Sequence, residues 1–225
     1  MAIEKNFFRQ VMGHFVTGVT VVTTNSQGKL ASLTANSFTS LSLNPPLVLV
    51  CVNNASYTLP LFRESKVFAV NLLTTKQVDI SCCFAIPSKD RFEHFCHASY
   101  HVAATGAPIL DNVLAFVDTH LVAEYPGGDH VIFVGQIEAI GVAGRVTFAN
   151  KDGKARSTLV DYHEYAADID NGSMPIPKVA PLVYYRGQYR HLANDYSGPS
   201  LTDMYDIELS QLKWWWGVFE EQTQP

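Results

Sequence analysis

The chain has 225 residues, of which 47% are hydrophobic and only 16% are charged, and its formal net charge is −5. This composition excludes general disorder, and the few scattered basic residues argue against nucleic-acid binding through a positive surface. The longest apolar stretch, residues 45–52, is too short to cross a bilayer, and residues 1–10 lack the apolar run of a secretory signal. We therefore expect a cytoplasmic globular protein with no nucleic-acid or membrane partner.

The apolar periodicity predicts a mostly β protein with a few helices. In chain order, strands are expected at residues 19–24, 30–43 (in two pieces), 45–53, 66–74, 115–125, 130–143 and 180–192. Helices are expected at residues 4–15, 56–65 and 76–85, whereas residues 86–100 look irregular. Because strands and helices do not alternate strictly, a doubly wound parallel sheet is disfavoured, and a closed or split β-barrel fits better.

Two glycine-bearing turns punctuate the second half of the chain. Residues 126–129 read PGGD, and these residue types alone predict a hairpin turn between two strands. Gly187, at the centre of the last strand, predicts a hairpin or a bulge. Along residues 115–125, Asp118 and His120 fall opposite the apolar positions in a count of period two, so both are expected to face away from the core.

The cysteines give no sign of a disulfide framework. There are four of them, and no two form a CxxC pair. They are Cys51, Cys82, Cys83 and Cys96. From this spacing we expect reduced thiols, which agrees with a cytoplasmic protein.

A small cluster of histidines raises the question of a metal site. His94, His97 and His101 have the spacing i, i+3, i+7, and Cys96 lies among them. The segment looks irregular, and Glu93 is the only convincing carboxylate partner. Histidines that face solvent or form hydrogen bonds are the simpler interpretation, and no metal site is predicted.

Residues 33–42 read LTANSFTSLS and are rich in small hydroxyl side chains. Such side chains, together with free backbone N–H groups, suit a polar ligand that lies flat against a sheet. A strand with one wet face would have the same composition. Composition alone therefore leaves both interpretations open.

Four segments together resemble the flavin-reductase-like FMN-binding split-barrel family. They read HFVTGVTVVTT (14–24), LTANSFTSLSLNPPLVLVCVNNASYT (33–58), GDHVIFVGQIEAI (128–140) and PLVYYRGQYRHL (181–192). The resemblance implies a six-stranded antiparallel split β-barrel over residues 1–193, in a homodimer with flavin at the subunit interface. It also implies hydride transfer from NADH or NADPH to FMN or FAD, with the reduced flavin supplied to a partner monooxygenase.

The same resemblance implies a set of flavin-binding residues. They are Thr34, Ala35, Asn36, Ser37, Ser40, Leu41, Ser42, Cys51, Val52 and Asn53. Ser56, Tyr57 and Thr58 follow at the expected start of a helix, where N–H groups favour a phosphate. Arg91 is a second candidate for the phosphate, although a solvent-exposed loop arginine is an equally simple interpretation.

The resemblance places the nicotinamide beside Gly128, Asp129 and His130. His130 is the one catalytic candidate, Asp129 would fix the loop, and Tyr185 completes the expected nicotinamide site. Arg186 and Tyr189 could reach the same cleft, and packing within the strand explains the two tyrosines equally well. The reaction needs stacked rings rather than a general acid or base, so the lack of a catalytic dyad is not an objection.

Two segments depart from short members of that family: an acidic loop at residues 164–178 and a tail at residues 194–225. The tail predicts an amphipathic helix with Trp214, Trp215 and Trp216 in a row, which either covers apolar surface or caps the flavin cleft. A capped cleft would favour a reductase that keeps FMN and acts on a small aromatic or nitroaromatic compound. A flavin-binding module without catalysis is the third interpretation.

Overall fold

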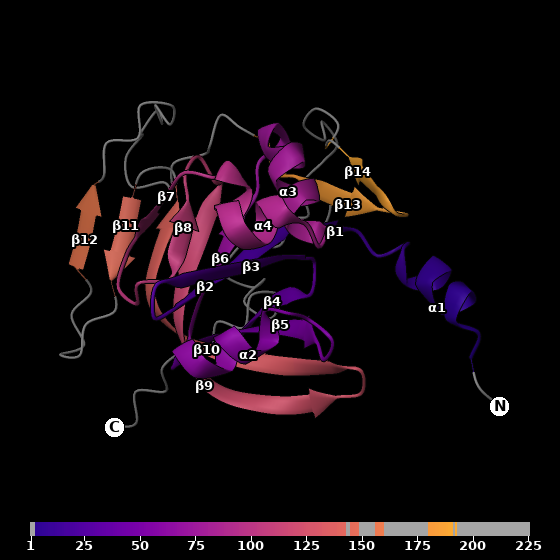
Figure 1. Cartoon of the computed structure of the whole chain (residues 1–225), viewed down its shortest axis with the longest axis horizontal. Coiled ribbons are helices and arrows are strands. Elements are labelled where there is room, and N and C mark those ends of the chain that lie inside the picture. The colour runs from indigo at the N-terminus through magenta and orange to yellow at the C-terminus, as the bar shows by residue number, and fades with distance from the viewer. Residues whose placement is uncertain (1–2, 143–144, 149–155, 160–179, 191, 193–225) are drawn as a thin grey trace, which may run out of the picture.

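The computed structural model describes residues 3–142, 145–148, 156–159, 180–190 and 192. Its main body is one antiparallel sheet of nine strands (Figure 1). These are β2 (Thr20–Ser26), β3 (Lys29–Ala35), β4 (Phe38–Leu43), β5 (Pro46–Asn53), β6 (Val67–Leu72), β9 (Ala115–Gly127), β10 (His130–Val142), β11 (Arg145–Phe148) and β12 (Arg156–Leu159). The strand order is β12-β11-β10-β9-β6-β2-β3, with β5 added to β10 and β4 added to β5.

Shorter elements surround this sheet. The strands are β1 (Thr17–Gly18), β13 (Val183–Tyr185) and β14 (Gln188–Arg190) in one small sheet, and β7 (Tyr100–Val102) and β8 (Pro108–Leu110) in another. The helices are α1 (Lys5–Met12), α2 (Leu59–Ser65), η1 (Thr75–Gln77), α3 (Val78–Ala85), α4 (Lys89–His94) and η2 (Phe95–His97). In the described ranges, no helix has the length and apolar character that a bilayer-spanning segment needs.

The mostly β, antiparallel architecture with flanking helices is confirmed, but the six-stranded ring is not. Strand β10 is 13 residues long and pairs with β9, β11 and β5, so the sheet branches there. Register shifts between Val134 and Gly135 and between Ile137 and Ala139 mark irregularities along the β9–β10 ladder, which let one strand change partners. The ladders between described residues form this branched path rather than a closed barrel.

Most of the predicted elements are present. The block at residues 30–43 divides into β3 and β4 as expected, and residues 183–190 form a hairpin in which Gly187 has a φ of 76°. The prediction for residues 86–100 is wrong, because α4 and η2 form there. Ser88 explains the start of α4, since its Oγ accepts a hydrogen bond from the Arg91 N–H at 3.2 Å.

Both faces of strand β2 are buried, which explains why its sequence lacks simple alternation. Val22 packs in a core with Phe62, Phe68 and Phe133, under α2. The neighbouring Val21 packs on the other face, in a second core that includes Phe84 of α3. A strand covered on both sides reads as a continuous β-branched run.

Asp118 is buried, contrary to the prediction that it faces away from the core. Its carboxylate accepts hydrogen bonds from the N–H groups of Ala104 (2.8 Å) and Thr105 (2.9 Å) and from the Thr105 hydroxyl. Burial raises the pKa of Asp118, and these donors act against that rise. The loop that supplies them covers the second face of β9, which a count of period two could not reveal.

The cysteine prediction is also wrong in part, because Cys83 and Cys96 form a disulfide. Cys51 and Cys82 are free thiols. The 13-residue separation gave no signal, since the pairing depends on α4 and η2 folding back onto α3. The acidic loop at 164–178 and the tail at 194–225, including Trp214–Trp216, lie outside the described residues.

Candidate functional site

Two turns that are far apart in sequence form one unit. Strand β5 pairs with β10 so that Asn53 lies opposite His130. The next residue, Asn54, donates its backbone N–H to the Asp129 carbonyl at 2.9 Å, and its Nδ2 donates to the Gly128 carbonyl at 3.1 Å. Gly128 has a φ of 75°, a left-handed conformation that strongly favours glycine. The structure thus joins the predicted flavin turn to the Gly128–His130 segment.

The ring of His130 is oriented by its neighbour. Its Nδ1 lies 2.7 Å from Asp129 Oδ1, and this hydrogen bond lowers the pKa of the exposed Asp129 carboxyl. An ionised carboxylate accepts a hydrogen bond from Nδ1–H, and in the tautomer that carries this hydrogen, Nε2 has the lone pair that can accept a hydrogen bond from a ligand. A nicotinamide carboxamide N–H is a suitable donor to that atom.

Ser37 and Cys51 form the joint between the hydroxyl-rich block and strand β5. The Ser37 hydroxyl donates to the Cys51 carbonyl at 3.0 Å, and the Cys51 N–H lies 3.3 Å from both the hydroxyl and the carbonyl oxygen of Ser37. Burial raises the pKa of the half-buried Cys51 thiol, which favours its protonated form. Val52 follows with its side chain inside the core, which leaves its main chain for any ligand contact.

The hydroxyl-rich block borders two hollows: Asn36, Phe38 and Thr39 help to line one of about 340 Å³, and the end of β3 helps to line a smaller one. The smaller hollow, about 200 Å³, is lined by Val19, Thr34, Ala35, Asn36, Ala85, Tyr184 and Tyr189. The Thr34 hydroxyl donates to the Ser81 carbonyl of α3 at 2.7 Å, so its side chain is already engaged. Ala35 is buried, whereas Asn36 is exposed at the bend before β4.

Strand β4 is an edge strand whose described partner is β5, and it carries the second part of the block. The pairing of β4 with β5 slips between Ser40 and Ser42, which leaves Leu41 as an extra residue in a bulge. Leu41 is half exposed. The three residues therefore lie at an accessible edge, as a ligand-binding segment requires.

Arg91 is buried, so the interpretation as a solvent-exposed loop arginine is wrong. Its Nε and one terminal nitrogen donate to the Ser32 carbonyl at 3.1 and 2.6 Å. No carboxylate of the described residues forms an ion pair with Arg91. Desolvation lowers the pKa of Arg91, yet guanidinium stays charged at neutral pH. The guanidinium also lies 5.1 Å from the Phe92 ring centroid, and a buried cation without a described carboxylate partner is suited to an anionic ligand.

The segment expected to hold the phosphate lies beside this arginine. The rings of Tyr57 and Phe92 have centroids 4.7 Å apart, which joins the turn before α2 to α4. Lys29 Nζ lies 5.1 Å from the Tyr57 ring centroid, and the hydroxyls of Ser56 and Thr58 are 2.8 Å apart. Two cations and two hydroxyls within one region fit a phosphate-bearing cofactor.

The structure does not bring Tyr185 into this region. Tyr185 belongs to the small β1–β13–β14 sheet, and its ring packs edge-on against His14 at 6.0 Å between centroids. Tyr189 lies instead beside α3, with its hydroxyl 2.8 Å from Ser81 Oγ. Arg186 sits in the exposed hairpin turn.

Sequence reasoning missed several contacts that hold the site together. Asn54, Ser81 and Phe92 each join two segments, but their partners are 35 to 108 residues away, so no local motif signalled these contacts. Within the histidine cluster, the rings of His94 and His97 stack with their centroids 5.2 Å apart. In the described part of the chain, no group of three or more His, Cys, Asp or Glu residues is arranged to hold a metal ion.

With this geometry in view, comparison with known proteins is decisive. The model of the "Flavin reductase like domain" matches residues 12–193. The chain belongs to this family. It is 29% identical over 198 residues to HsaB of Mycobacterium tuberculosis, the reductase subunit of a flavin-dependent monooxygenase, with 88% of each chain covered. It is 34% identical over 142 residues to a flavin reductase of Pseudomonas putida, covering 63% of this chain and 82% of that one.

A solved structure extends the likeness to the fold. The NADH:FAD oxidoreductase SgcE6 of Streptomyces globisporus, in complex with NAD and FAD fragments, matches with a TM-score of 0.64 and 28% identity. The match covers 85% of this chain and 94% of that one. The predicted family and the predicted NAD(P)H-dependent flavin oxidoreductase activity are thus confirmed.

Proposed function

We propose that this flavin reductase takes hydride from NADH or NADPH, passes it to FMN or FAD, and releases the reduced flavin to a separate monooxygenase. The observation that carries the proposal is the family match over residues 12–193, to which the reductase subunits of two-component monooxygenases also belong. Bound flavin supplies the hydride acceptor. The FMN-binding type of split barrel, over residues 1–193 with 194–225 as an extension, is part of the same proposal.

In this proposal, the flavin ring lies along Thr34–Ser37, Ser40–Ser42 and Cys51–Asn53. The exposed bulge of β4 and the Ser37–Cys51 joint support that placement, because both leave main-chain groups near an accessible edge. Ala35 and Val52 contribute only main-chain atoms, since their side chains are in the core. Ordered N–H groups that face the ring stabilise negative charge that develops on it.

The flavin phosphate is proposed to bind between Arg91 and the Ser56–Thr58 turn. Arg91 holds its guanidinium in place through Ser32 before any ligand arrives, so little side-chain freedom is lost on binding. Lys29 adds a second positive charge nearby. The 7-residue helix α2, which starts at Leu59 after a Thr58 without a side-chain cap, is too short for its N-terminus to carry the phosphate site alone.

On the nicotinamide side, His130 is proposed to accept a hydrogen bond at Nε2 from the carboxamide, while Asp129 holds Nδ1–H. Gly128 permits the turn, and Asn54 fixes it against β5. These groups orient the ring that donates hydride and need not transfer a proton themselves. For Tyr185, only the resemblance supports a role in the nicotinamide site, because its described ring contact is with His14.

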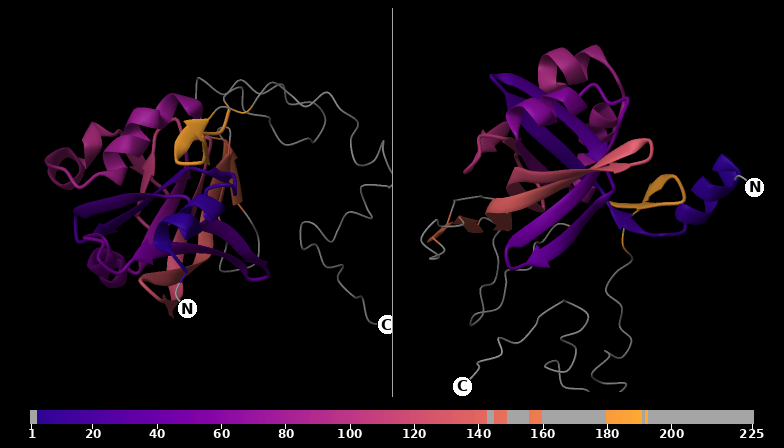
Figure 2. Two further views of the ribbon diagram at one scale, coloured as in Figure 1. Left: turned by 90° about the vertical axis from the view of Figure 1, so that its right-hand side faces the viewer. Right: turned by 90° about the horizontal axis from the view of Figure 1, so that it is seen from below.

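A homodimer is also proposed, and α1 supplies the support for it. This helix has no buried residues and stands away from the sheet (Figure 1 and the right view of Figure 2). Its exposed apolar residues are Phe7, Phe8, Val11 and Met12, and Phe15 follows. An unpartnered apolar face of this kind is typical of an interface. Sedimentation of the full chain and of a Phe7→Ser/Phe8→Ser variant tests this, and an unchanged oligomeric state would contradict it.

The tail is tested in the same way. Deletion of residues 196–225 is expected to weaken dimerisation or to speed flavin exchange, because three adjacent indoles cannot share one helical face and need apolar surroundings on two sides. Sedimentation and flavin off-rates provide the measurement. If both match the full chain, the tail is a passive extension.

The function itself is tested by anaerobic NADH and NADPH oxidation with FMN or FAD, with and without aromatic or nitroaromatic compounds. We expect the protein to oxidise the nucleotide with flavin as the only acceptor. We also expect it to lose its flavin on gel filtration. A protein that stays yellow and oxidises NADH only with an organic substrate would support a flavin-retaining enzyme instead. Flavin binding without oxidation of either nucleotide would indicate a module without catalysis. The proposed location is the cytoplasm, where both nucleotides are available.

A further inference from the structure

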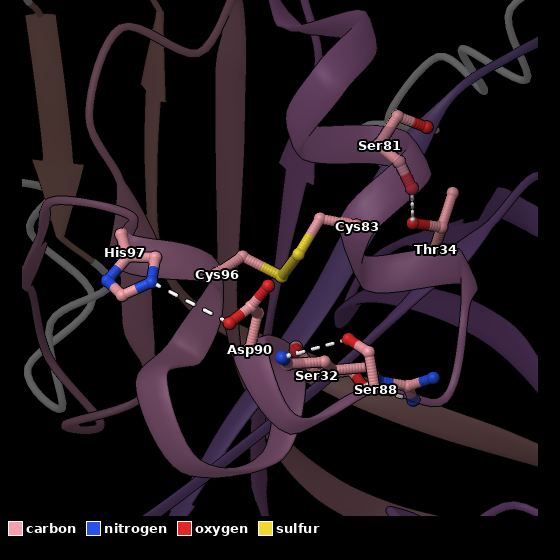
Figure 3. Close-up of a disulfide and its surroundings, with 9 residues drawn as sticks. Ser32, Thr34, Ser81, Cys83, Ser88, Asp90, Cys96 and His97 are labelled. Carbon is pink, nitrogen blue, oxygen red and sulfur yellow. Dashed lines mark hydrogen bonds and ion pairs between the residues drawn. A yellow bond between two sulfur atoms is a disulfide. The ribbon is translucent and has the colours of Figure 1, made fainter.

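The disulfide links two helices that lie over the same strand. Cys83 is in α3 and Cys96 is in η2, directly after α4, with Cα atoms 6.1 Å apart. Figure 3 shows the bond reaching from α3 across to the segment that follows α4. Cys82, the neighbour of Cys83, is a free thiol whose Sγ lies 3.7 Å from the Tyr189 hydroxyl. The bond therefore ties the two helices together through one member of a vicinal cysteine pair.

Helix α3 and helix α4, which η2 follows directly, support strand β3 at different points. In α3, the Ser81 carbonyl accepts the hydrogen bond of Thr34. In α4, the Arg91 guanidinium donates to the Ser32 carbonyl. The disulfide thus connects the support of the proposed ring site to the support of the proposed phosphate site.

The segment after α4 needs such a connection. Phe95, Cys96 and His97 have φ values of 50°, 51° and 52°, a left-handed conformation that non-glycine residues adopt at a cost. Its contacts include the Phe95 ring against Phe84 and Tyr100, with centroids 5.1 and 5.4 Å apart, and His97 Nε2 at 3.8 Å from Asp90 Oδ1. The disulfide is the covalent contact, and it fixes Cys96 to α3. Without the bond this segment has more freedom, and so has Arg91 a few residues before it.

We propose that Cys83 and Cys96 are a redox modification site, oxidised by hydrogen peroxide, whose disulfide state tightens the binding of phosphate-bearing flavin. This inference rests on the proposed function, because it requires Arg91 to hold the flavin phosphate. It assigns the free Cys82 no part in the bond.

The reductase reaction supplies the oxidant. When no monooxygenase takes up the reduced flavin, oxygen in solution accepts two electrons and two protons from it and becomes hydrogen peroxide. One thiolate attacks the peroxide O–O bond, which forms a sulfenic acid and releases one water after protonation. The second thiol attacks the sulfenic sulfur, forms the S–S bond and releases a second water. Two thiols lose two electrons in total, hydrogen peroxide gains them, and low-molecular-weight thiols reverse the change.

The device limits wasteful turnover. Tighter flavin binding slows the release of reduced flavin, so peroxide made by uncoupled turnover reduces the supply of the species that generates it. Linkage requires the reverse effect as well: bound FMN must favour the disulfide over the dithiol by the same factor. This reciprocity is a property that a merely structural disulfide need not have.

The test compares the peroxide-oxidised and the dithiothreitol-reduced full-length protein. Reduction is expected to raise the Kd for FMN about five- to tenfold, the usual range of such couplings. The Kd for riboflavin, which lacks the phosphate, is expected to change by under about twofold, because the effect acts through Arg91. In a glutathione redox buffer, saturating FMN should shift the disulfide equilibrium by the same factor, and tenfold corresponds to about 30 mV.

Matched variants complete the test. Cys83→Ser and Cys96→Ser are each expected to show the reduced-state affinity and no response to reductant, whereas Cys82→Ser keeps the full response. The proposal is overturned by equal FMN affinities in both redox states, by equal shifts for riboflavin and FMN, or by loss of the response in Cys82→Ser. If neither redox state binds flavin or oxidises NADH with it, the proposed function fails; if both do so with identical constants, only this inference fails.

Discussion

The turn wall of the candidate site, residues 53–58 with 127–130, is held mainly by the main chain, whereas the helix wall, α3 with α4, is held by side chains. In the turn wall, ladder pairing and the Asn54 N–H to Asp129 carbonyl bond set the geometry. In the helix wall, the contacts are Thr34 to Ser81, Arg91 to Ser32 and the disulfide.

This difference determines what substitution can change. Main-chain hydrogen bonds do not depend on side-chain identity, so the turn wall keeps its shape when a side chain is replaced, and only the contact made by that side chain is lost. The helix wall depends on a few particular side chains, so one replacement there moves several groups. We therefore expect the largest effects in the helix wall and graded, local effects in the turn wall.

The largest effect is expected for Arg91→Met, which removes a buried cation from the helix wall. Loss of a hydrogen-bonded charge costs ~1.5–3 kcal/mol, so the Kd for FMN should rise about 10- to 100-fold, with little change for riboflavin. Fluorescence quenching by both flavins is the measurement. Arg63→Met is the control, because Arg63 is an exposed arginine paired with Glu124. Equal losses for FMN and riboflavin would remove Arg91 from the phosphate site.

Ser37→Leu tests the joint between the hydroxyl-rich block and strand β5, outside both walls. The larger side chain blocks the ring site and removes the hydrogen bond to the Cys51 carbonyl. We expect flavin Kd to rise about 30-fold, with the protein still dimeric, and Ser37→Ala to show a smaller rise because it loses only the hydrogen bond. Flavin titration measures the Kd of both variants, and wild-type affinity in Ser37→Leu would contradict the placement of the ring.

His130→Ala tests the turn wall itself. Loss of one hydrogen bond to the nucleotide should raise its apparent KM about tenfold and leave flavin affinity nearly unchanged. Steady-state kinetics with NADH and NADPH provide the measurement. His120→Ala is the control, since His120 is an exposed histidine on β9, 3.8 Å from Glu138. Unchanged nucleotide kinetics in a folded His130→Ala protein would exclude His130 from the site.

Asn54→Ala should have the smallest effect, because the main-chain bond to Asp129 remains and only the bond from Nδ2 to Gly128 is lost. We expect the KM for the nucleotide to rise about threefold. If Asn54 acts by positioning His130, adding Asn54→Ala to His130→Ala should cost nothing further. Fully additive losses in this double-mutant cycle would show that Asn54 acts independently.

Local pattern was sufficient for most of the fold and for the turn wall. The apolar run of β5, the long β9 and β10 with their Pro-Gly-Gly-Asp turn, and the glycine of the last hairpin were all predictable, since strand period and turn chemistry depend on neighbouring residues. His130 at the start of a strand followed from the same turn, whereas its pairing with Asn53 was not predicted, because β5 and β10 are far apart in the sequence.

The helix wall was not predictable in the same way. For Arg91 the sequence left a phosphate ligand and an exposed loop arginine equally open, while Asp118 looked like an outward-facing acid and Cys83 and Cys96 like separate thiols. Each of these residues owes its environment to a segment that packs over it, and packing partners are not encoded at any fixed spacing.

The sequence by itself determined the antiparallel architecture and the positions of the turns, because periodicity and turn chemistry act over a few residues, and its four motifs carried the resemblance to the family. Only the tertiary structure decided which groups are buried and paired: the cation of Arg91 against Ser32, the Asp118 carboxylate under its loop, and the bond between α3 and η2. The physical reason is that burial and pairing depend on distant segments meeting, and that meeting is governed by the packing of the whole chain.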